Sequence, residues 1–263
     1  MPAGVHSVNP GSTAFDLSGK VALVTGAAQG IGAAIADALS AHGASTVICD
    51  CNADAIASTN VGCKALVCDV TDLNQVRRTV AAVDEEFGHI DVLVNNAGIH
   101  RRGSPTDFDP QDIDDLFNVN LKGCFQMSGA VGEVMIRQQS GSVINISALG
   151  GGIVGLGRGG SIYGITKGGI VSLTRDLAAE WGRYGIRVKA LAPGWIRTPM
   201  TQPLQNDAAK SAKVLERVPL KRWGEASEVA GAAVFLASDA SQYITGHTIP
   251  IDGGAANVIA ISE

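Results

Sequence analysis

The sequence predicts an α/β fold, in which helices cover both faces of a parallel sheet. Two patterns predict it: short β-branched runs alternate with longer helical periods, and a glycine-rich turn directly follows the first run. The composition agrees, because 46% of the 263 residues are hydrophobic, only 5% are aromatic and 33 are glycine. Such a chain suits a core of small aliphatic side chains joined by many tight turns.

Seven short apolar runs are predicted as buried strands. They are rich in Val, Ile and Leu, and most lack the strict alternation that a half-solvated strand shows. In chain order they are Lys20–Thr25, Ser45–Asp50, Lys64–Cys68, Ile90–Asn95, Ser142–Ser147, Ile186–Ala192 and Thr248–Ile251.

Apolar residues between these runs recur at helical spacing. Clear cases are Ile31, Ile35, Ala38 and Leu39, followed later by Ile170, Leu173, Leu177 and Trp181. Strands that alternate with helices need crossover connections, and right-handed crossovers give a parallel sheet with helices on both faces. No linker or repeat interrupts the pattern, so we predict one domain over residues 17–263 after a flexible tail over residues 1–16.

Charge and hydropathy limit the classes of partner. The formal net charge is −5 and no basic block exceeds Arg101-Arg102, which argues against a nucleic-acid partner. No uncharged apolar run reaches the ~18 residues that span a bilayer, and the N-terminus lacks the pattern of a secretory signal. The five cysteines are odd in number and lack the spacing of a metal site. We therefore expect reduced thiols, no metal, no membrane partner and a cytoplasmic protein.

The glycine-rich turn is a candidate dinucleotide site. It lies between the first strand and the first helix, where glycines let the backbone approach a diphosphate and free N–H groups of the helix favour its charge. The candidate residues are Gly26, Gln29, Gly30, Ile31 and Gly32.

Two carboxylates follow the next two strands. Asp50 ends the second strand, where it would accept hydrogen bonds from an adenosine ribose and repel a 2′-phosphate. This position favours NAD over NADP. Asp69 and Val70 follow the third strand and would contact adenine, although Asp69 serves equally well as a helix N-cap. After the fourth strand, the small residues of the turn that contains Asn96, Ala97 and Gly98 would allow close approach of the cofactor.

A Tyr–Lys pair is the candidate catalytic centre. Tyr163 and Lys167 lie four residues apart at the start of an amphipathic helix, so they share one face. A nearby ammonium and a cationic nicotinamide would both favour the phenolate and lower the tyrosine pKa. Ser147, at the end of the fifth strand, would donate to a substrate oxygen, and Asn120 would order a water that carries protons to solvent.

Together these motifs resemble those of the short-chain dehydrogenase/reductase family, over about Leu17 to Gly254. The matching residues are Gly26, Gly30, Gly32, Asn95–Gly98, Asn120, Ser147, Tyr163, Lys167, Pro193-Gly194 and Asp252–Gly254. The resemblance implies a seven-stranded Rossmann-like sheet, a nicotinamide cofactor and a homotetramer. It also implies that Tyr163 is the acid/base and that Lys167 holds the nicotinamide ribose. Ser147 would then position the substrate, and Asn120 would support the proton relay.

The stretch between Ser147 and Tyr163 is longer and richer in glycine than the family pattern. Ser142 and Ser161 therefore stay open as alternatives to Ser147, although we expect Ser161 to cap the following helix. We interpret residues 150–160 as a mobile loop at the active site. Residues 199–217 are polar and would form a lid.

The expected activity is hydride transfer between NAD(H) and a secondary alcohol or ketone, such as a polyol, a sugar or a cyclic alcohol. Pro193, Ile196 and Thr198 would complete the nicotinamide and diphosphate site. The substrate candidates are Ser147, Leu149, Arg158, Tyr163 and Trp195, with His100 and Gly157 also near the expected pocket. An NADP-dependent ketoreductase of the same fold is the alternative, and a nucleotide-binding scaffold without activity is a third possibility.

Overall fold

The computed structural model describes residues 14–58, 64–157 and 159–256. Its centre is a seven-stranded sheet with all strands parallel, in the order β3-β2-β1-β4-β5-β6-β7. The predicted fold class and all seven predicted strands are therefore confirmed. The strands are β1 (Val21–Thr25), β2 (Ser45–Asp50), β3 (Lys64–Val67), β4 (Val92–Asn95), β5 (Gly141–Ile146), β6 (Ile186–Pro193) and β7 (Thr248–Ile251).

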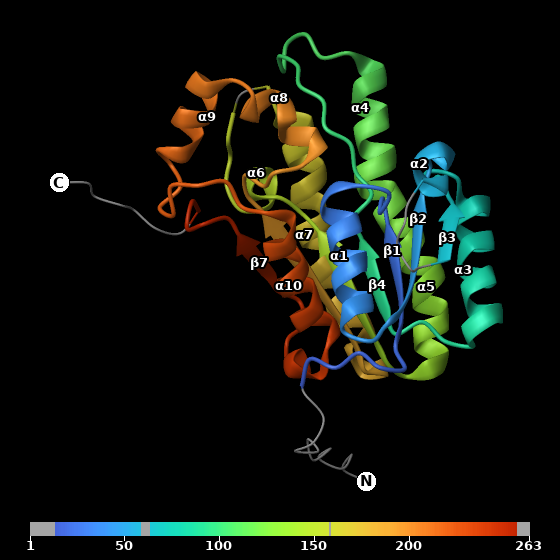
Figure 1. The fold of residues 1–263 in the computed structure, drawn as a ribbon. Coiled ribbons are helices and arrows are strands. Elements are labelled where there is room, and N and C mark those ends of the chain that lie inside the picture. Colours follow the sequence, from blue (N-terminus) through green and yellow to red (C-terminus); the bar gives the residue numbers. More distant parts are fainter. Residues whose placement is uncertain (1–13, 59–63, 158, 257–263) are drawn as a thin grey trace.

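Helices connect the strands and form a layer on each side of the sheet (Figure 1). The longer ones are α1 (Gly30–Ala41), α3 (Leu73–Phe87), α5 (Cys124–Gln138), α7 (Ser161–Trp181) and α10 (Ala226–Ala237). The shorter ones are α2 (Ala53–Ala57), α4 (Pro110–Leu116), α6 (Leu149–Gly152), α8 (Gln202–Gln205) and α9 (Ala208–Leu215), with a π-helix η1 (Phe117–Gly123) and 3₁₀ turns η2 (Gly182–Tyr184), η3 (Pro199–Thr201) and η4 (Asp239–Ser241).

Two hydrophobic cores lie on opposite faces of the sheet. Alternate residues of each buried strand enter one core or the other, as the two-residue period of a strand requires. In β1, Ala22 and Val24 pack with α1 and α10, whereas Val21 and Leu23 pack with α3, α5 and α7. The sheet is thus covered on both faces, and its strand ends remain as the place for a site.

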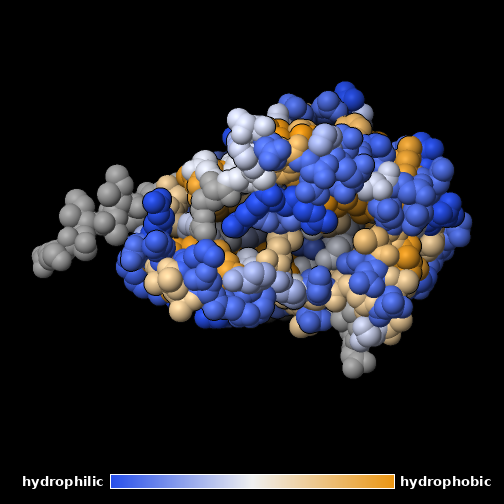
Figure 2. Space-filling model, turned by 90° about the horizontal axis from the view of Figure 1, so that it is seen from above, coloured by the Kyte–Doolittle hydropathy of each residue, from blue (hydrophilic) through white to orange (hydrophobic). Residues whose placement is uncertain are grey.

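The parallel strands bring their carboxyl ends to one edge of the sheet. The turns after β1, β4, β5 and β6 meet there, and the cluster of α6, α8 and α9 lies above them (Figure 1). Figure 2 looks onto this face and shows hydrophilic residues across its middle, with smaller hydrophobic patches between them. This face holds the candidate site.

Several sequence predictions concern segments outside the sheet. Residues 1–13 and Arg158 lie outside the described residues, so the tail over 1–16 and the single domain over 17–263 stay predictions. The expected cap at Ser161 is wrong, because Ser161 is the first residue of α7 and Gly160 occupies the N-cap position. No helix within the described ranges combines the length and hydrophobicity that crossing a bilayer requires.

Candidate active site

The turn after β1 is shaped to receive a dinucleotide diphosphate. Gly26 has φ +61°, and a Cβ on it would lie 2.6 Å from the Cα of Ala97. Only glycine therefore lets the turns after β1 and β4 approach so closely. Helix α1 begins at Gly30 after Gln29, without a side-chain cap and without an acidic residue in its first turn. Its first N–H groups are thus left for an anionic ligand.

The turn after β4 braces the turn after β1. The N–H groups of Asn96 and Ala97 both donate to Thr25 Oγ1 at 3.1 Å. The Asn96 amide donates to the carbonyl oxygens of Thr25 and Gly26 at 3.0 and 2.7 Å. Asn96 therefore acts on the cofactor site through the glycine turn, with its side chain directed at that turn.

Asp50 lies where the sequence placed it, at the end of β2 beside the glycine turn. Its carboxylate accepts hydrogen bonds from the backbone N–H of Ala28 at 3.3 Å and of Asn52 at 3.0 Å. These two contacts fix a carboxylate at the position where an adenosine ribose would bind.

Asp69 follows β3 and accepts from both the N–H and the hydroxyl of Thr71, at 2.9 and 2.8 Å. The interpretation of Asp69 as a helix N-cap was wrong, because Asp72 caps α3 by accepting from Asn74 N–H at 2.8 Å. Val70 is buried, and the Cβ that Gly123 lacks would overlap the Val70 side chain. The isopropyl group of Val70 is therefore packed inside the protein, and contacts of Asp69 and Val70 with adenine stay a prediction.

The segment after β6 closes the cofactor site from the other side. Pro193 ends β6 and Ile196 is buried, while a Cβ on Gly30 would lie 3.8 Å from Thr198. The hydroxyls of Thr198 and Thr201 are 3.2 Å apart and hold η3 at this place. The structure thus brings Thr198 next to the glycine turn, across 168 residues of chain. Ile31 and Gly32 belong to α1 itself, immediately after this contact.

The four candidate catalytic residues converge beside these turns. Lys167 is buried and donates from Nζ to the carbonyl of Ile146 at 2.8 Å, and its Nζ lies 5.8 Å from the centroid of the Tyr163 ring. The Cβ that Gly98 lacks would be 3.5 Å from that Nζ. The predicted pair is therefore one unit, in contact with the turn after β4.

Asn120 lies in the π-helix η1 and is fully buried. Its amide accepts from Ile99 N–H at 2.8 Å and donates to the Ile99 carbonyl at 3.0 Å and to Thr166 Oγ1 at 3.1 Å. Thr166 in turn donates to the Tyr163 carbonyl at 2.8 Å. Asn120 thus connects the turn after β4 with the helix of Tyr163. The sequence reasoning missed Thr166 and Ile99, and Thr166 could have been noticed between Tyr163 and Lys167.

Ser147 lies between the end of β5 and the start of α6, and its hydroxyl donates to the Lys167 carbonyl at 2.8 Å. It is only 2% exposed, and its hydroxyl must turn away from the Lys167 carbonyl before it can donate to a substrate. The two alternatives lie elsewhere. Ser142 is near the start of β5 and bonds to the carbonyl of Leu236, whereas Ser161 is exposed at the start of α7. Ser147 is therefore the serine next to the pair.

Burial shifts the ionisation of both members of the pair. It raises the pKa of Tyr163 to about 12 and lowers the pKa of Lys167 to about 8, against a smaller raising effect of Cys124. Desolvation sets the tyrosine pKa in the protein alone, and the joint lowering expected from Lys167 and a cationic nicotinamide stays a prediction. A cationic nicotinamide ring would have to supply the missing positive charge.

The glycine-rich segment before α7 is packed in part against the catalytic helix. Gly151 has φ +86°, and a Cβ there would lie 2.1 Å from the Gly164 carbonyl oxygen. A backbone hydrogen bond of 3.0 Å from Gly103 to the carbonyl of Gly159 ties this segment to the loop after β4. The start of this segment is thus the short helix α6, in which Gly151 and Gly152 pack on α7, and the mobility expected for residues 150–160 stays a prediction. Leu149 is 2% exposed and offers little surface to a substrate.

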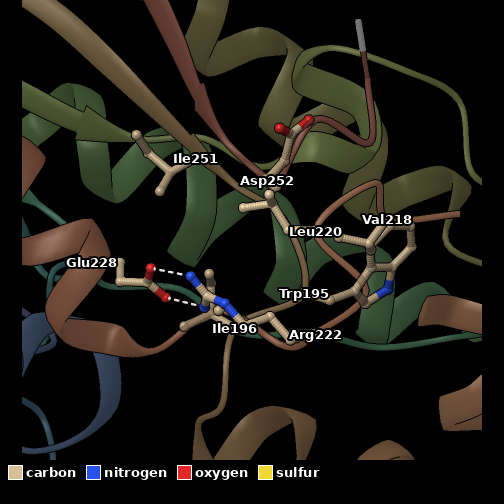
Figure 3. A pocket seen from close by; sticks show the side chains of 10 residues that line it. Trp195, Ile196, Val218, Leu220, Arg222, Glu228, Ile251 and Asp252 are labelled. Atoms are coloured by element: carbon tan, nitrogen blue, oxygen red, sulfur yellow. Dashed lines mark hydrogen bonds and ion pairs between the residues drawn. The ribbon is translucent and has the colours of Figure 1, made fainter. Parts of the chain in front are cut away.

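A second pocket lies beside the ends of β6 and β7 (Figure 3). Trp195 and Ile196 line it, and Arg222 donates to both carboxylate oxygens of Glu228 at 2.7 Å. This bidentate pair lowers the pKa of Glu228 to about 2. Neither Tyr163 nor Lys167 is among the described residues that line the pocket, so the role of Trp195 in substrate binding stays a prediction.

Most of the described cysteines are buried, as Cys49 and Cys68 are. The two members of the C-x-C pair differ, because Cys49 is buried whereas Cys51 is exposed. Among the described residues, no group of three or more His, Cys, Asp or Glu side chains could hold a metal ion.

Comparison with known proteins shows the family of the chain. A family described as enoyl-(acyl carrier protein) reductase matches residues 26–256. The chain belongs to the short-chain dehydrogenase/reductase family. Within this family it is 39% identical to gluconate 5-dehydrogenase of Gluconobacter oxydans strain 621H, over 91% of the chain and 96% of that protein. It is 42% identical to a 3-oxoacyl-(acyl-carrier-protein) reductase of Thermotoga maritima, over 90% and 98%.

A solved structure of a short-chain dehydrogenase/reductase shows the same fold. The gluconate 5-dehydrogenase of Burkholderia cenocepacia J2315, crystallised with NADP and tartrate, superposes with a TM-score of 0.87 at 38% identity. The match covers 93% of this chain and 98% of that one. The chain is thus an oxidoreductase of this family with a nicotinamide dinucleotide, NAD or NADP, as its cofactor.

Proposed function

We propose that this protein transfers a hydride between NAD(H) and a secondary alcohol or ketone of a sugar acid or polyol, with Tyr163 as the acid/base. The observation that carries the proposal is the convergence of Tyr163, Lys167 and Ser147 beside a glycine turn shaped for a diphosphate. The sugar-acid class is supported by the relatives named gluconate 5-dehydrogenase.

The residues of the chain divide the work of such a reaction. The bound dinucleotide supplies the hydride acceptor and a positive charge. In the oxidising direction, the Tyr163 phenolate accepts the proton of the substrate hydroxyl, and Ser147 hydrogen-bonds the same oxygen after its hydroxyl rotates away from the Lys167 carbonyl. Lys167 holds the nicotinamide ribose, while Asn120 fixes Ile99 and Thr166 on both sides of the pair.

Other residues are assigned to cofactor binding in the same proposal. The diphosphate would lie over the glycine turn and Thr198, the adenosine ribose on Asp50, and adenine beside Asp69. The full set is Gly26, Gln29, Gly30, Ile31, Gly32, Asp50, Asp69, Val70, Asn96, Ala97, Gly98, Tyr163, Lys167, Pro193, Ile196 and Thr198.

Replacement of the phenol tests the reaction. We expect Tyr163→Phe to lower kcat/KM for NAD-dependent oxidation of gluconate by about 10³, since positioned acid–base groups contribute ~10²–10⁴. Tyr243→Phe is the matched control, because Tyr243 is fully exposed, and it should stay within about twofold. NADH formation followed by absorbance measures both. Wild-type activity in Tyr163→Phe would show that Tyr163 is not the acid/base.

The preference for NAD rests on Asp50. We expect the ratio of kcat/KM for NAD over NADP to exceed one in the wild type and to fall about tenfold or more in Asp50→Ala, since the carboxylate would repel a 2′-phosphate. Asp176→Ala, on the exposed face of α7, is the control. Tighter binding of NADP than of NAD to the wild type in calorimetry would contradict this preference.

An NADP-dependent ketoreductase is the second candidate, favoured by the 42% identity to the 3-oxoacyl-(acyl-carrier-protein) reductase. Rates with gluconate and with a 3-oxoacyl thioester, each measured with both cofactors, separate the two functions.

A homotetramer and a cytoplasmic location are further parts of the proposal. The tetramer is supported by hydrophobic side chains that are exposed on helices, Phe125 at 59% and Ile165 at 54%. The cytoplasmic location is supported by the free thiols of the described cysteines. Light scattering of the purified protein tests the tetramer.

A further inference from the structure

His100 is held in a fixed place beside the catalytic tyrosine. The residue before it, Ile99, is bonded through both its N–H and its carbonyl to the Asn120 amide, at 2.8 and 3.0 Å. The residue after it, Arg101, forms an ion pair with Asp112 at 3.2 Å and donates to the His100 carbonyl at 3.2 Å. The backbone on each side of His100 is therefore anchored.

The imidazole contacts the phenol ring of Tyr163 edge-on. The two ring centroids are 4.7 Å apart at an interplanar angle of 69°, a favourable geometry for an aromatic pair. His100 is half-buried, and in the described part of the chain neither of its ring nitrogens has a hydrogen-bond partner. Two polar atoms without a partner among the described residues thus belong to a ring that packs directly against the ring of Tyr163.

The surroundings of the imidazole favour its neutral form by lowering its pKa. Burial lowers its pKa first, and the positive charges of Arg102 and Arg101 lower the pKa further. A neutral imidazole carries one donor and one acceptor nitrogen, whereas the protonated form can only donate. A hydroxyl group is likewise both donor and acceptor, so a substrate hydroxyl is a suitable partner for either nitrogen.

We propose that His100 determines substrate specificity by hydrogen bonding to a second hydroxyl, on the carbon next to the one that reacts. The reacting oxygen meets the Tyr163 hydroxyl, and the oxygen on the neighbouring carbon then lies toward the ring that packs against Tyr163. Sugar acids and polyols carry such neighbouring hydroxyls, while simple secondary alcohols do not. This inference rests on the proposed function and adds to it the residue that distinguishes these substrates.

Two substrates that differ by one hydroxyl test the inference. The readout is the ratio of kcat/KM for trans-1,2-cyclohexanediol over that for cyclohexanol, measured by NADH formation with the full-length protein. We expect this ratio to fall about tenfold in His100→Phe, the factor that one net hydrogen bond provides. Phenylalanine keeps the edge-on contact with Tyr163 and removes both nitrogens. His100→Leu provides the same readout should the larger ring disturb folding.

His42→Phe is the matched control, because His42 is exposed after the end of α1, and its ratio should equal that of the wild type. The inference is overturned if the ratio in His100→Phe and His100→Leu equals that of the wild type. If kcat/KM also falls equally for both substrates, His100 serves packing alone. If the wild type oxidises gluconate but His100→Phe has the same ratio as the wild type, this inference is overturned and the proposed function stands. A wild type inactive on every polyhydroxy substrate would overturn both.

Discussion

Lys167 and Lys189 are both buried amines, and they lie near opposite ends of strand β5. Lys189 is fully buried beside Ser142 near the start of that strand, where its Nζ donates to Ser142 Oγ at 2.8 Å and to the Leu236 carbonyl at 3.0 Å. Lys167 is 4% exposed beside Ile146 at the other end, and in the described residues its Nζ donates to that one carbonyl alone. Burial lowers the pKa of both amines.

The difference between the two lysines is what surrounds them. The Leu236 carbonyl at the end of α10 also accepts from Ser142, Arg187 and Ser241, so Lys189 belongs to a closed polar cluster that ends a helix. Lys167 instead faces the Tyr163 ring and the turn after β4. Two side chains of one type, both buried, thus face different groups, and the proposed function assigns chemistry only to the one that faces Tyr163.

The largest expected effect separates the two lysines by activity. Lys167→Met should lower kcat/KM by about 10³, because under the proposed function it removes the cation that would hold the ribose and assist the phenolate. Lys189→Met should stay within about twofold, because it changes only the cluster at the end of α10. Steady-state NADH formation measures the activity of both variants. Comparable losses in the two would contradict the different roles assigned to the two lysines.

A smaller effect is expected from the helix that carries Lys167. Gly151→Ala places a methyl against the Gly164 carbonyl and forces alanine to φ +86°, so α7 must shift. We expect kcat/KM to fall about tenfold and the free energy of unfolding to fall by about 2 kcal/mol. Gly155→Ala is the control, since a Cβ there meets nothing within 4 Å. Equal results for the two variants in kinetics and urea unfolding would contradict the packing of α6 on α7.

The smallest effect concerns stability at Lys189. Lys189→Met removes a buried amine while Leu236 keeps three other donors, so we expect the free energy of unfolding to rise by about 1 kcal/mol at pH 7. The folded pKa of Lys189 is lowered, so its unfavourable contribution is complete below that pKa and shrinks as pH rises toward the unfolded value of 10.5. Urea unfolding at pH 7 and pH 10 should show the variant's advantage shrinking, and an advantage that grows with pH would contradict the assignment.

The sequence predicted the parts that depend on periodicity and local order. The short runs of Val, Ile and Leu located all seven strands, and the helical period located the helices that start at Gly30 and Ser161. The glycine turn and the spacing of Tyr163 and Lys167 located the site. These features depend on residues close together in the chain, which is why one sequence sufficed for them.

The parts that were missed depend on contacts between distant segments. The hydroxyl of Ser147 points to the Lys167 carbonyl because α6 covers it, and the pKa of Tyr163 is raised because several elements exclude water from it. The reason for the glycine at Gly151 appears only once Gly164 lies against it. Rotamers, desolvation and such close approaches are set by tertiary packing, and no local pattern encodes them.

The ionisation of Tyr163, followed by tyrosinate absorbance, tests the central claim most directly. The difference between wild type and Tyr163→Phe isolates this phenol from Tyr184 and Tyr243. With burial raising its pKa to about 12, we expect no ionisation below ~pH 10 in the protein alone, and ionisation near neutral pH once NAD⁺ is bound. The same titration curve with and without NAD⁺ would contradict the claim that the cofactor's charge prepares this tyrosine for proton transfer.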